Sequence, residues 1–139
     1  MRFGFHQLLR NKSVDIIQPD ICACGGLTEA KRIASLASTY GVDVVPHTWG
    51  SSIGLHVALH FISNLESVPG RMFSPDFLLE FDQTENALRE QLTFPILEME
   101  NGIIQVPDCP GLGLEVNPDA LRKFTNPTNG IADIKELLK

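Results

Sequence analysis

An aspartate and a histidine each follow a short run of β-branched residues, and they carry the clearest chemical signal in the chain. Asp20 ends the run at residues 14–20, and His47 ends the run at residues 42–47. A histidine gains or loses a proton near neutral pH, and a neighbouring carboxylate fixes its tautomer and favours its charged form. The pair therefore predicts general acid/base chemistry, with His47 as the base and Asp20 as the group that orients it.

The segments around this pair are typical of a parallel α/β sheet. Residues 14–18 and 42–45 are predicted to be buried strands, and apolar residues from Leu27 to Ala37 repeat at helical spacing between them. A strand, a crossover helix and a second strand bring the two strand ends together at the carboxyl edge of the sheet. We therefore expect Asp20 and His47 to be neighbours.

Other elements complete an α-β-α-β-α-β order. Helices are predicted at residues 3–12 and from Ser51 or Ser52 to about Leu65. A third strand is predicted at residues 77–81, with Glu80 near its end.

The pattern changes after Asp82, where the βα repeat does not continue. Asn101-Gly102 predicts a hairpin turn between the extended runs 97–100 and 103–106. Residues 118–122 favour a helical turn, and a short helix is expected near Lys139.

Composition narrows the functional classes without naming one. The chain has 139 residues, of which 43% are hydrophobic and 20% charged, as in one globular domain. The net charge of −6 argues against binding to nucleic acid or to an acidic membrane surface. No apolar run approaches the roughly 18 residues that span a bilayer, and no secretory signal is evident. Cys22, Cys24 and Cys109 lack the spacing of zinc ligands, so we expect reduced thiols and a cytoplasmic location.

Two further motifs have simpler structural explanations. Residues 50–54 fit the G-x-S-x-G pattern of a hydrolase nucleophile, but the last histidine, His60, follows Ser52 closely with no acid between them. Ser52 is therefore interpreted as a residue of a helix start. His56 and His60 share the spacing of metal ligands on a helix, but no third ligand is evident, so both are predicted to be packing or surface residues.

Several ordered motifs resemble the enolase superfamily, and within it the mandelate racemase subgroup of the mandelate racemase/muconate lactonizing enzyme family. They are Gln18-Pro19-Asp20, Gly25-Gly26-Leu27-Thr28-Glu29-Ala30, Pro46-His47, Leu79-Glu80 and the closing V-P-D-x-P-G-L-G at 106–113. The resemblance implies an α/β fold, the C-terminal portion of a TIM-type (β/α)₈ barrel. Residues 1–90 would supply three βα units with strands 6–8, and 91–125 a segment that packs back toward a capping domain. Residues 126–139 are unassigned.

The resemblance also implies a reaction and a role for each residue. His47 would be the general acid/base, Asp20 would hold and polarise its ring, and Glu80 would contact carboxylate or enolate oxygens of a small carboxylate substrate. From its place just after His47, Trp49 is expected either to line the substrate pocket or to pack. Cys22, in the loop after Asp20, is expected either to line the same pocket or to be a spacer residue. Mg²⁺ would stabilise the enolate, but its ligands belong to strands that this sequence lacks, so no metal ligand is expected here. The reaction would be dehydration of an acid sugar, which we favour, or racemisation of a hydroxy acid.

The missing strands leave two alternatives. The chain is expected to be a C-terminal fragment that is inactive alone, since a full barrel needs about 250 residues. Alternatively, it is a non-catalytic half-barrel. Three strands cannot close a barrel, so their unpaired edges would be covered by another copy or by a partner chain that carries the missing strands. A homo-oligomer is the arrangement expected.

Overall fold

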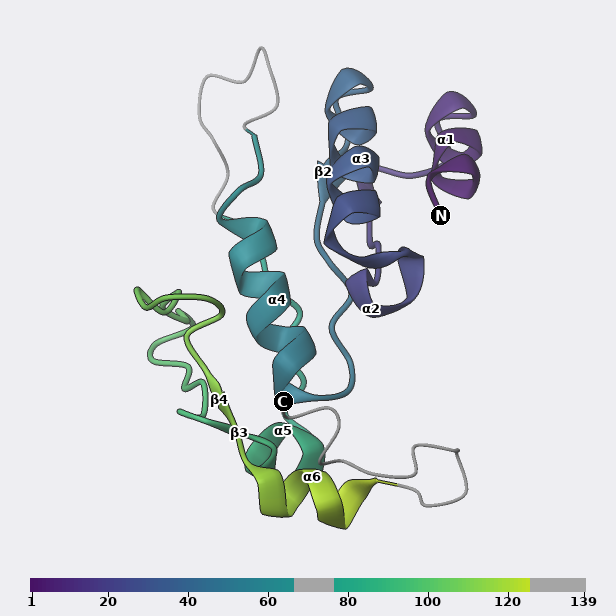
Figure 1. Cartoon of the computed structure of the whole chain (residues 1–139). Helices are drawn as coiled ribbons and strands as arrows, with labels where there is room; N and C mark the ends of the chain where they lie inside the picture. Colours follow the sequence, from purple (N-terminus) through teal and green to yellow (C-terminus); the bar gives the residue numbers. More distant parts are fainter. Residues whose placement is uncertain (67–76, 126–139) are drawn as a thin grey trace.

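The computed structural model describes residues 1–66 and 77–125 (Figure 1). Helices and short strands alternate in the first half, and two short helices flank a second pair of strands in the second half. In chain order the elements are α1 (Arg2–Arg10), β1 (Ile16–Ile17), α2 (Ile21–Cys24), α3 (Gly26–Thr39), β2 (Asp43–Val44), α4 (Ser52–Ile62), α5 (Ala87–Gln91), β3 (Thr93–Phe94), β4 (Glu115–Val116) and α6 (Pro118–Phe124).

The parallel pair β1–β2 positions the two predicted site residues. Ile16 lies opposite Asp43 and Ile17 opposite Val44, and α3 provides the crossover between the strands. The pairing continues beyond the strands, because the His47 amide donates to the Pro19 carbonyl oxygen at 3.2 Å. Pro19 has no backbone N–H, so it cannot donate the next hydrogen bond of the ladder between the strands. This explains why the strands are shorter than predicted. The predicted βαβ unit, and with it the α/β class, is confirmed.

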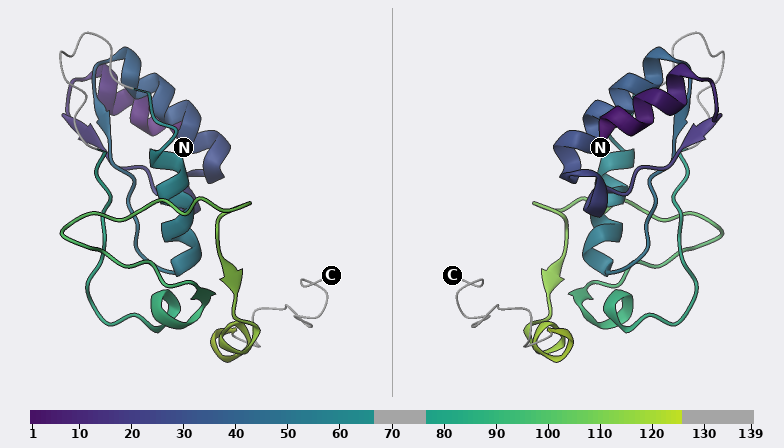
Figure 2. Two further views of the ribbon diagram at one scale, coloured as in Figure 1. Left: turned by 90° about the vertical axis from the view of Figure 1, so that its left-hand side faces the viewer. Right: turned by 90° about the vertical axis from the view of Figure 1, so that its right-hand side faces the viewer.

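The core lies between this strand pair and the helices. Ala30, Ile33 and Ala37, on one face of α3, are completely buried. They belong to one apolar cluster with Leu9 of α1 and Ile17 of β1, and α4 adds further members. Figure 2 shows α1, α3 and α4 on the same side of the strand pair. The periodicity that predicted α3 therefore marks its core-facing side.

A short helix, α2, was not predicted, and it begins immediately after Asp20. The Asp20 carboxylate accepts a hydrogen bond from the Cys22 amide at 2.8 Å and caps this helix. Gly25, with φ of 118°, ends α2 and leads into α3. An L side chain rarely adopts this conformation, so the turn requires glycine there.

The second half differs from the prediction in two places. Residues 77–81 do not form the predicted strand, because each hydrogen bond between Thr48 and Glu80 joins a backbone group of one residue to a side-chain group of the other, and no backbone ladder forms there. The Asn101-Gly102 turn is present, with both φ angles positive, but its hairpin pairs only Glu100 with Ile103. The antiparallel partners are instead β3 and β4, distant in sequence.

The predicted helical turn at residues 118–122 is confirmed as α6, which Asn117 caps. The helix expected near Lys139 lies outside the described residues. Among the helices of the described parts of the chain, none has the length and apolar character to cross a membrane.

Candidate active site

Asp20 and His47 lie side by side where β1 and β2 end. The two residues form a parallel β-bridge, as expected from strand ends that meet at one edge of the sheet. The segments that follow them diverge: Asp20 leads directly into α2, and His47 leads into a loop that ends at α4. The sequence therefore predicted the neighbourhood of the site correctly.

The histidine takes its hydrogen-bond partner from a third segment. His47 Nδ1 lies 2.6 Å from Glu80 Oε2, and the Thr48 amide donates to the same oxygen at 3.0 Å. The Thr48 hydroxyl also donates to the Glu80 carbonyl oxygen. A carboxylate oxygen accepts from a protonated Nδ1, which assigns the lone pair of the neutral ring to Nε2. Nε2 is therefore the nitrogen able to take up a proton.

The carboxylate that orients the imidazole in this structure is Glu80 and not Asp20, which was predicted to do so. Asp20 uses its carboxylate oxygen to cap α2 through the Cys22 amide. Its effect on the charge of His47 stays a prediction, and so does the contact of Glu80 with substrate. The side chains of His47 and Glu80 are 45% and 41% exposed, which leaves the pair open to a ligand.

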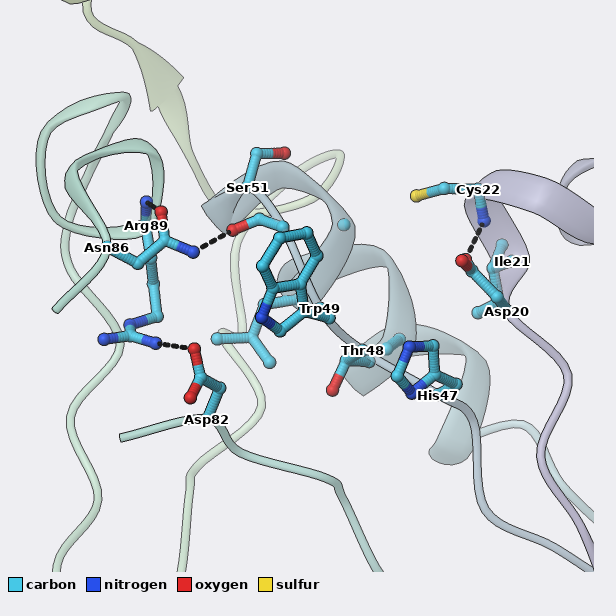
Figure 3. A pocket seen from close by; sticks show the side chains of 14 residues that line it. Asp20, Ile21, Cys22, His47, Thr48, Trp49, Ser51, Asp82, Asn86 and Arg89 are labelled. Carbon is cyan, nitrogen blue, oxygen red and sulfur yellow. Dashed lines mark hydrogen bonds and ion pairs between the residues drawn. The ribbon is translucent and has the colours of Figure 1, made fainter. Parts of the chain in front are cut away.

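An open pocket adjoins this pair (Figure 3). It has a volume of about 480 Å³, which includes space open to solvent, and Asp20, Cys22, His47 and Trp49 are among its lining residues. Trp49 is 73% exposed, so its ring is available to a ligand and contributes little to the core. Burial, and then the negative charge of Asp20, raise the pKa of the Cys22 thiol, which keeps it protonated at neutral pH. Trp49 and Cys22 thus lie beside this pocket, and their contact with a substrate stays a prediction.

Three polar residues on the opposite wall were missed by the sequence reasoning. Asp82, Asn86 and Arg89 also line the pocket, and Figure 3 shows Asp82 paired with Arg89. The Arg89 guanidinium lies 2.9 Å from an Asp82 oxygen. Hydrogen bonds from the backbone and then the hydroxyl of Thr84, followed by Arg89, hold the pKa of Asp82 below its usual range. The available sequence signal was Asn86 in front of A-L-R-E-Q, which is an N-cap followed by helix formers.

The other candidate residues have structural roles. Ser52 is buried in the first turn of α4, so it is not an exposed nucleophile. His56 is fully buried, and its Nδ1 lies 2.9 Å from the Ser52 carbonyl oxygen. His60 Nε2 lies 3.2 Å from the carbonyl oxygen of Leu112. Both histidines therefore have structural contacts within the fold.

The donor set of the site does not fit a magnesium ion. Within residues 1–66 and 77–125, no group of three or more His, Cys, Asp or Glu residues is arranged to hold a metal. The carboxylates nearest the pocket are already engaged: Asp20 with a backbone amide, Glu80 with His47, and Asp82 with Arg89. Mg²⁺ requires several oxygen ligands in octahedral geometry, which these groups do not offer.

Most of the chain matches the model of a known family. A family model described as "Enolase C-terminal domain-like" matches residues 1–120. The chain belongs to this family. The resemblance to the enolase superfamily is confirmed, and the β1–α3–β2 unit is part of its α/β barrel.

Relatives in the enolase superfamily include enzymes that act on sugar acids. The chain is 43% identical to D-galactarolactone cycloisomerase of Agrobacterium fabrum over 91% of this chain and 33% of that protein. It is 35% identical to L-rhamnonate dehydratase of Saccharopolyspora erythraea over 85% of this chain and 28% of that protein. A crystal structure of the 3,6-anhydro-D-galactonate cycloisomerase from Zobellia galactanivorans, 46% identical, matches with a TM-score of 0.79 over 91% of this chain and 33% of that one. The chain thus spans about a third of the length of these relatives, as the C-terminal part.

Proposed function

We propose that this chain supplies the proton-transfer part of an enzyme that removes the proton α to the carboxylate of a sugar acid. The observation that carries the proposal is the His47–Glu80 contact beside Asp20 at the end of a parallel strand pair. A base that acts at neutral pH must hold a free lone pair and be oriented by a partner. His47 meets both conditions, since Glu80 engages Nδ1 and leaves Nε2 as the basic nitrogen.

In the proposed reaction, Nε2 of His47 takes the proton from the α-carbon of the substrate. The resulting imidazolium remains hydrogen-bonded to Glu80, and the adjacent Asp20 carboxylate also favours its positive charge. The electron pair left on the α-carbon forms a double bond to the β-carbon while the bond from the β-carbon to its oxygen substituent breaks. The departing oxygen takes up a proton from the His47 imidazolium or from water. Trp49, which is exposed at the pocket, would cover one side of the bound sugar acid and exclude water.

The family implies Mg²⁺ to stabilise the negative charge that develops on the substrate carboxylate. The described residues do not fit that ion, so in this proposal the ion is held by residues outside them. The chain alone is accordingly expected to be inactive, and the part of the reaction assigned to its own residues is the proton transfer.

Two reactions share this proton transfer. If the departing β-oxygen is a free hydroxyl group, the product results from dehydration, the reaction favoured by the sequence analysis. If the β-oxygen belongs to a ring, the same electron movement opens that ring. The 43% and 46% identities to two cycloisomerases favour the second version over the 35% identity to a dehydratase. His47 would have the same role in both.

A chimera tests the proposal directly. Residues 1–125 would replace the matching third of the Agrobacterium fabrum D-galactarolactone cycloisomerase, and the exchange of the substrate α-proton with deuterium from D₂O would be followed by NMR. We expect the chimera to exchange this proton and His47→Asn to abolish the exchange. His6→Asn, on the exposed surface of α1, is the matched control and should leave the rate unchanged. Undiminished exchange in a folded His47→Asn chimera would refute the role of His47.

A second candidate function, self-assembly, is favoured by exposed apolar residues in β1 and in the segment before Glu80. Ile16 of β1 is 46% exposed, and Phe77 and Leu78, which precede Glu80, are 49% and 60% exposed. In the described residues β1 and β2 form a sheet of two strands, and the edge of a sheet is where a strand of another chain can pair. Size-exclusion chromatography with light scattering, with and without Mg²⁺, tests this candidate. A defined homo-oligomer would support it, and a stable monomer would contradict it.

A further inference from the structure

The loop that carries His47 and Trp49, together with the first residue of α4, is hydrogen-bonded at every second residue to the segment 80–88. Thr48 contacts Glu80 through its amide and hydroxyl, as described above. The Gly50 carbonyl oxygen accepts from the side-chain amide of Asn86 at 2.9 Å. The Ser52 hydroxyl lies 3.4 Å from the Leu88 carbonyl oxygen, the longest and weakest of these contacts.

The Asn86 side chain differs from the other side chains in these contacts because it both caps α5 and holds the His47 loop. Its carbonyl oxygen accepts from the Leu88 and Arg89 amides, at 3.1 and 3.4 Å, and so caps α5. Its NH₂ group crosses to the His47 loop and donates to Gly50. Gly50 has φ of 130°, where an L side chain is strained, so the loop makes an unusual turn at the point that Asn86 holds.

The segment that contains Asn86 is itself braced. Arg89 pairs with Asp82 at 2.9 Å and donates to the Thr84 carbonyl oxygen. The Arg89 and Asp82 side chains are only 15% and 20% exposed, so this pair is better shielded from solvent than the His47–Glu80 pair. The brace closes the turn between residues 82 and 89 and gives Asn86 a fixed position from which to hold the loop.

We propose that Asn86 is a positioning residue that orders the loop between His47 and α4, through its hydrogen bond to the Gly50 carbonyl oxygen. This hydrogen bond would thereby fix the position of Trp49 and limit the motion of the His47 side chain relative to Glu80. The inference rests on the proposed function for its significance, because only an acid/base role of His47 makes its position matter. The contact itself can be tested without any turnover.

Asn86→Asp separates the two roles of the side chain. Aspartate retains the oxygen that caps α5, but it replaces the NH₂ donor by an oxygen that repels the Gly50 carbonyl. Trp49 is the single tryptophan of the chain, so its fluorescence anisotropy decay in the full 139-residue protein reports on this loop alone. We expect about a twofold larger amplitude of nanosecond depolarisation in the variant, as for a loop released from one anchor. We also expect exchange broadening of the His47 ring signals in ¹H–¹⁵N spectra.

Asn117→Asp is the matched control. Asn117 caps α6 in the same way, through the Asp119 and Ala120 amides, while its NH₂ group donates to the Gln91 carbonyl oxygen and not to the loop. This variant should leave both signals as in the unmodified chain. Circular dichroism checks the fold, and Asn86→Ser, which caps but is too short to reach Gly50, replaces Asn86→Asp if the latter does not fold.

The proposal is overturned if folded Asn86→Asp or Asn86→Ser shows the Trp49 depolarisation of the unmodified chain. It is also overturned if Asn117→Asp changes that signal equally, since the effect would then be general. Neither readout requires substrate, so such a failure is distinct from failure of the proposed function, which appears as α-proton exchange that does not depend on His47.

Discussion

Asp20 has an observed role in the fold and a proposed role in the chemistry, and a pair of substitutions can separate them. Its carboxylate caps α2 at 2.8 Å from the Cys22 amide, and the residue also borders His47. Asp20→Ala removes both roles. Asp20→Asn keeps an oxygen that can cap the helix and removes only the negative charge.

The expected magnitudes follow from the exposure of the cap. Replacing an N-cap aspartate by alanine costs about 0.5–2 kcal/mol. The Asp20–Cys22 hydrogen bond is exposed, so water can satisfy the released amide, and the cost should lie near the lower end, about 0.5–1 kcal/mol. With a urea m-value of about 2 kcal/mol/M, the unfolding midpoint should fall by about 0.3–0.5 M in Asp20→Ala. In Asp20→Asn it should change by less than about 0.2 M, because asparagine is as good an N-cap.

Urea unfolding followed by circular dichroism measures these midpoints in the 139-residue chain. The α-proton exchange of the chimera measures the chemical role, and Asp20→Asn should slow it even though the fold is retained. An Asp20→Ala midpoint equal to that of the unmodified chain would refute the capping argument. Full exchange activity in Asp20→Asn would show that the negative charge of Asp20 does not assist His47.

Three other perturbations test the core, the acid stability and the thiol of the pocket. Ile33→Ala removes a fully buried side chain of the core cluster and should cost about 2–5 kcal/mol, seen as a loss of about 10 °C in the thermal unfolding midpoint. The hydrogen bond from the Arg2 backbone amide, followed by the Arg2 guanidinium charge, holds the pKa of Glu29 below its ordinary value of 4.5. The stability that this contact gives the folded chain is complete above pH 4.5 and is lost as the pH falls through the lowered pKa of the folded state. Glu29→Gln should therefore lower the urea midpoint more at about pH 7 than at about pH 3, and an equal effect at both would contradict the assignment. The charge of Asp20 helps to raise the pKa of Cys22, so Asp20→Asn should speed alkylation of Cys22 by iodoacetamide at neutral pH. Mass spectrometry would measure the ratio of alkylated Cys22 to alkylated Cys109, which is exposed. A ratio equal to that of the unmodified chain would count against the electrostatic contact.

The elements that the sequence predicted well are those whose signal is local. Helix α3 was visible because Ala30, Ile33 and Ala37 recur at helical spacing and all face the core. The strand pair was visible because β-branched runs flank that helix, and the approach of Asp20 to His47 followed from it. Helix α2 is too short to show any periodicity, and it depends on a capping side chain that was interpreted only as a catalytic candidate.

The features that the sequence did not predict depend on contacts between distant segments. The β3–β4 pairing joins Thr93 to Val116 and has no local turn signal. Glu80 reaches His47 although its own segment forms no strand, so the strand predicted at residues 77–81 was wrong and the contact with His47 was not predicted. The Asp82–Arg89 brace and the Asn86 contact likewise arise only when residues 80–91 fold against the His47 loop. Side-chain to backbone contacts of this kind leave no periodic pattern in a sequence.

The hydrogen bonds around the pocket suggest why the chemistry would be divided along the polypeptide. The three nearest carboxylates, of Asp20, Glu80 and Asp82, already accept from an amide, an imidazole and a guanidinium. Each of these groups is placed to orient or polarise a neighbour, and within the described residues no three His, Cys, Asp or Glu side chains come together to hold a cation. In the proposed function, His47 would hold and move a proton, and the donors that stabilise the enolate charge would come from outside the described residues. On this reasoning, activity should be restored by adding the metal-binding part of the barrel and not by adding Mg²⁺ to the chain alone.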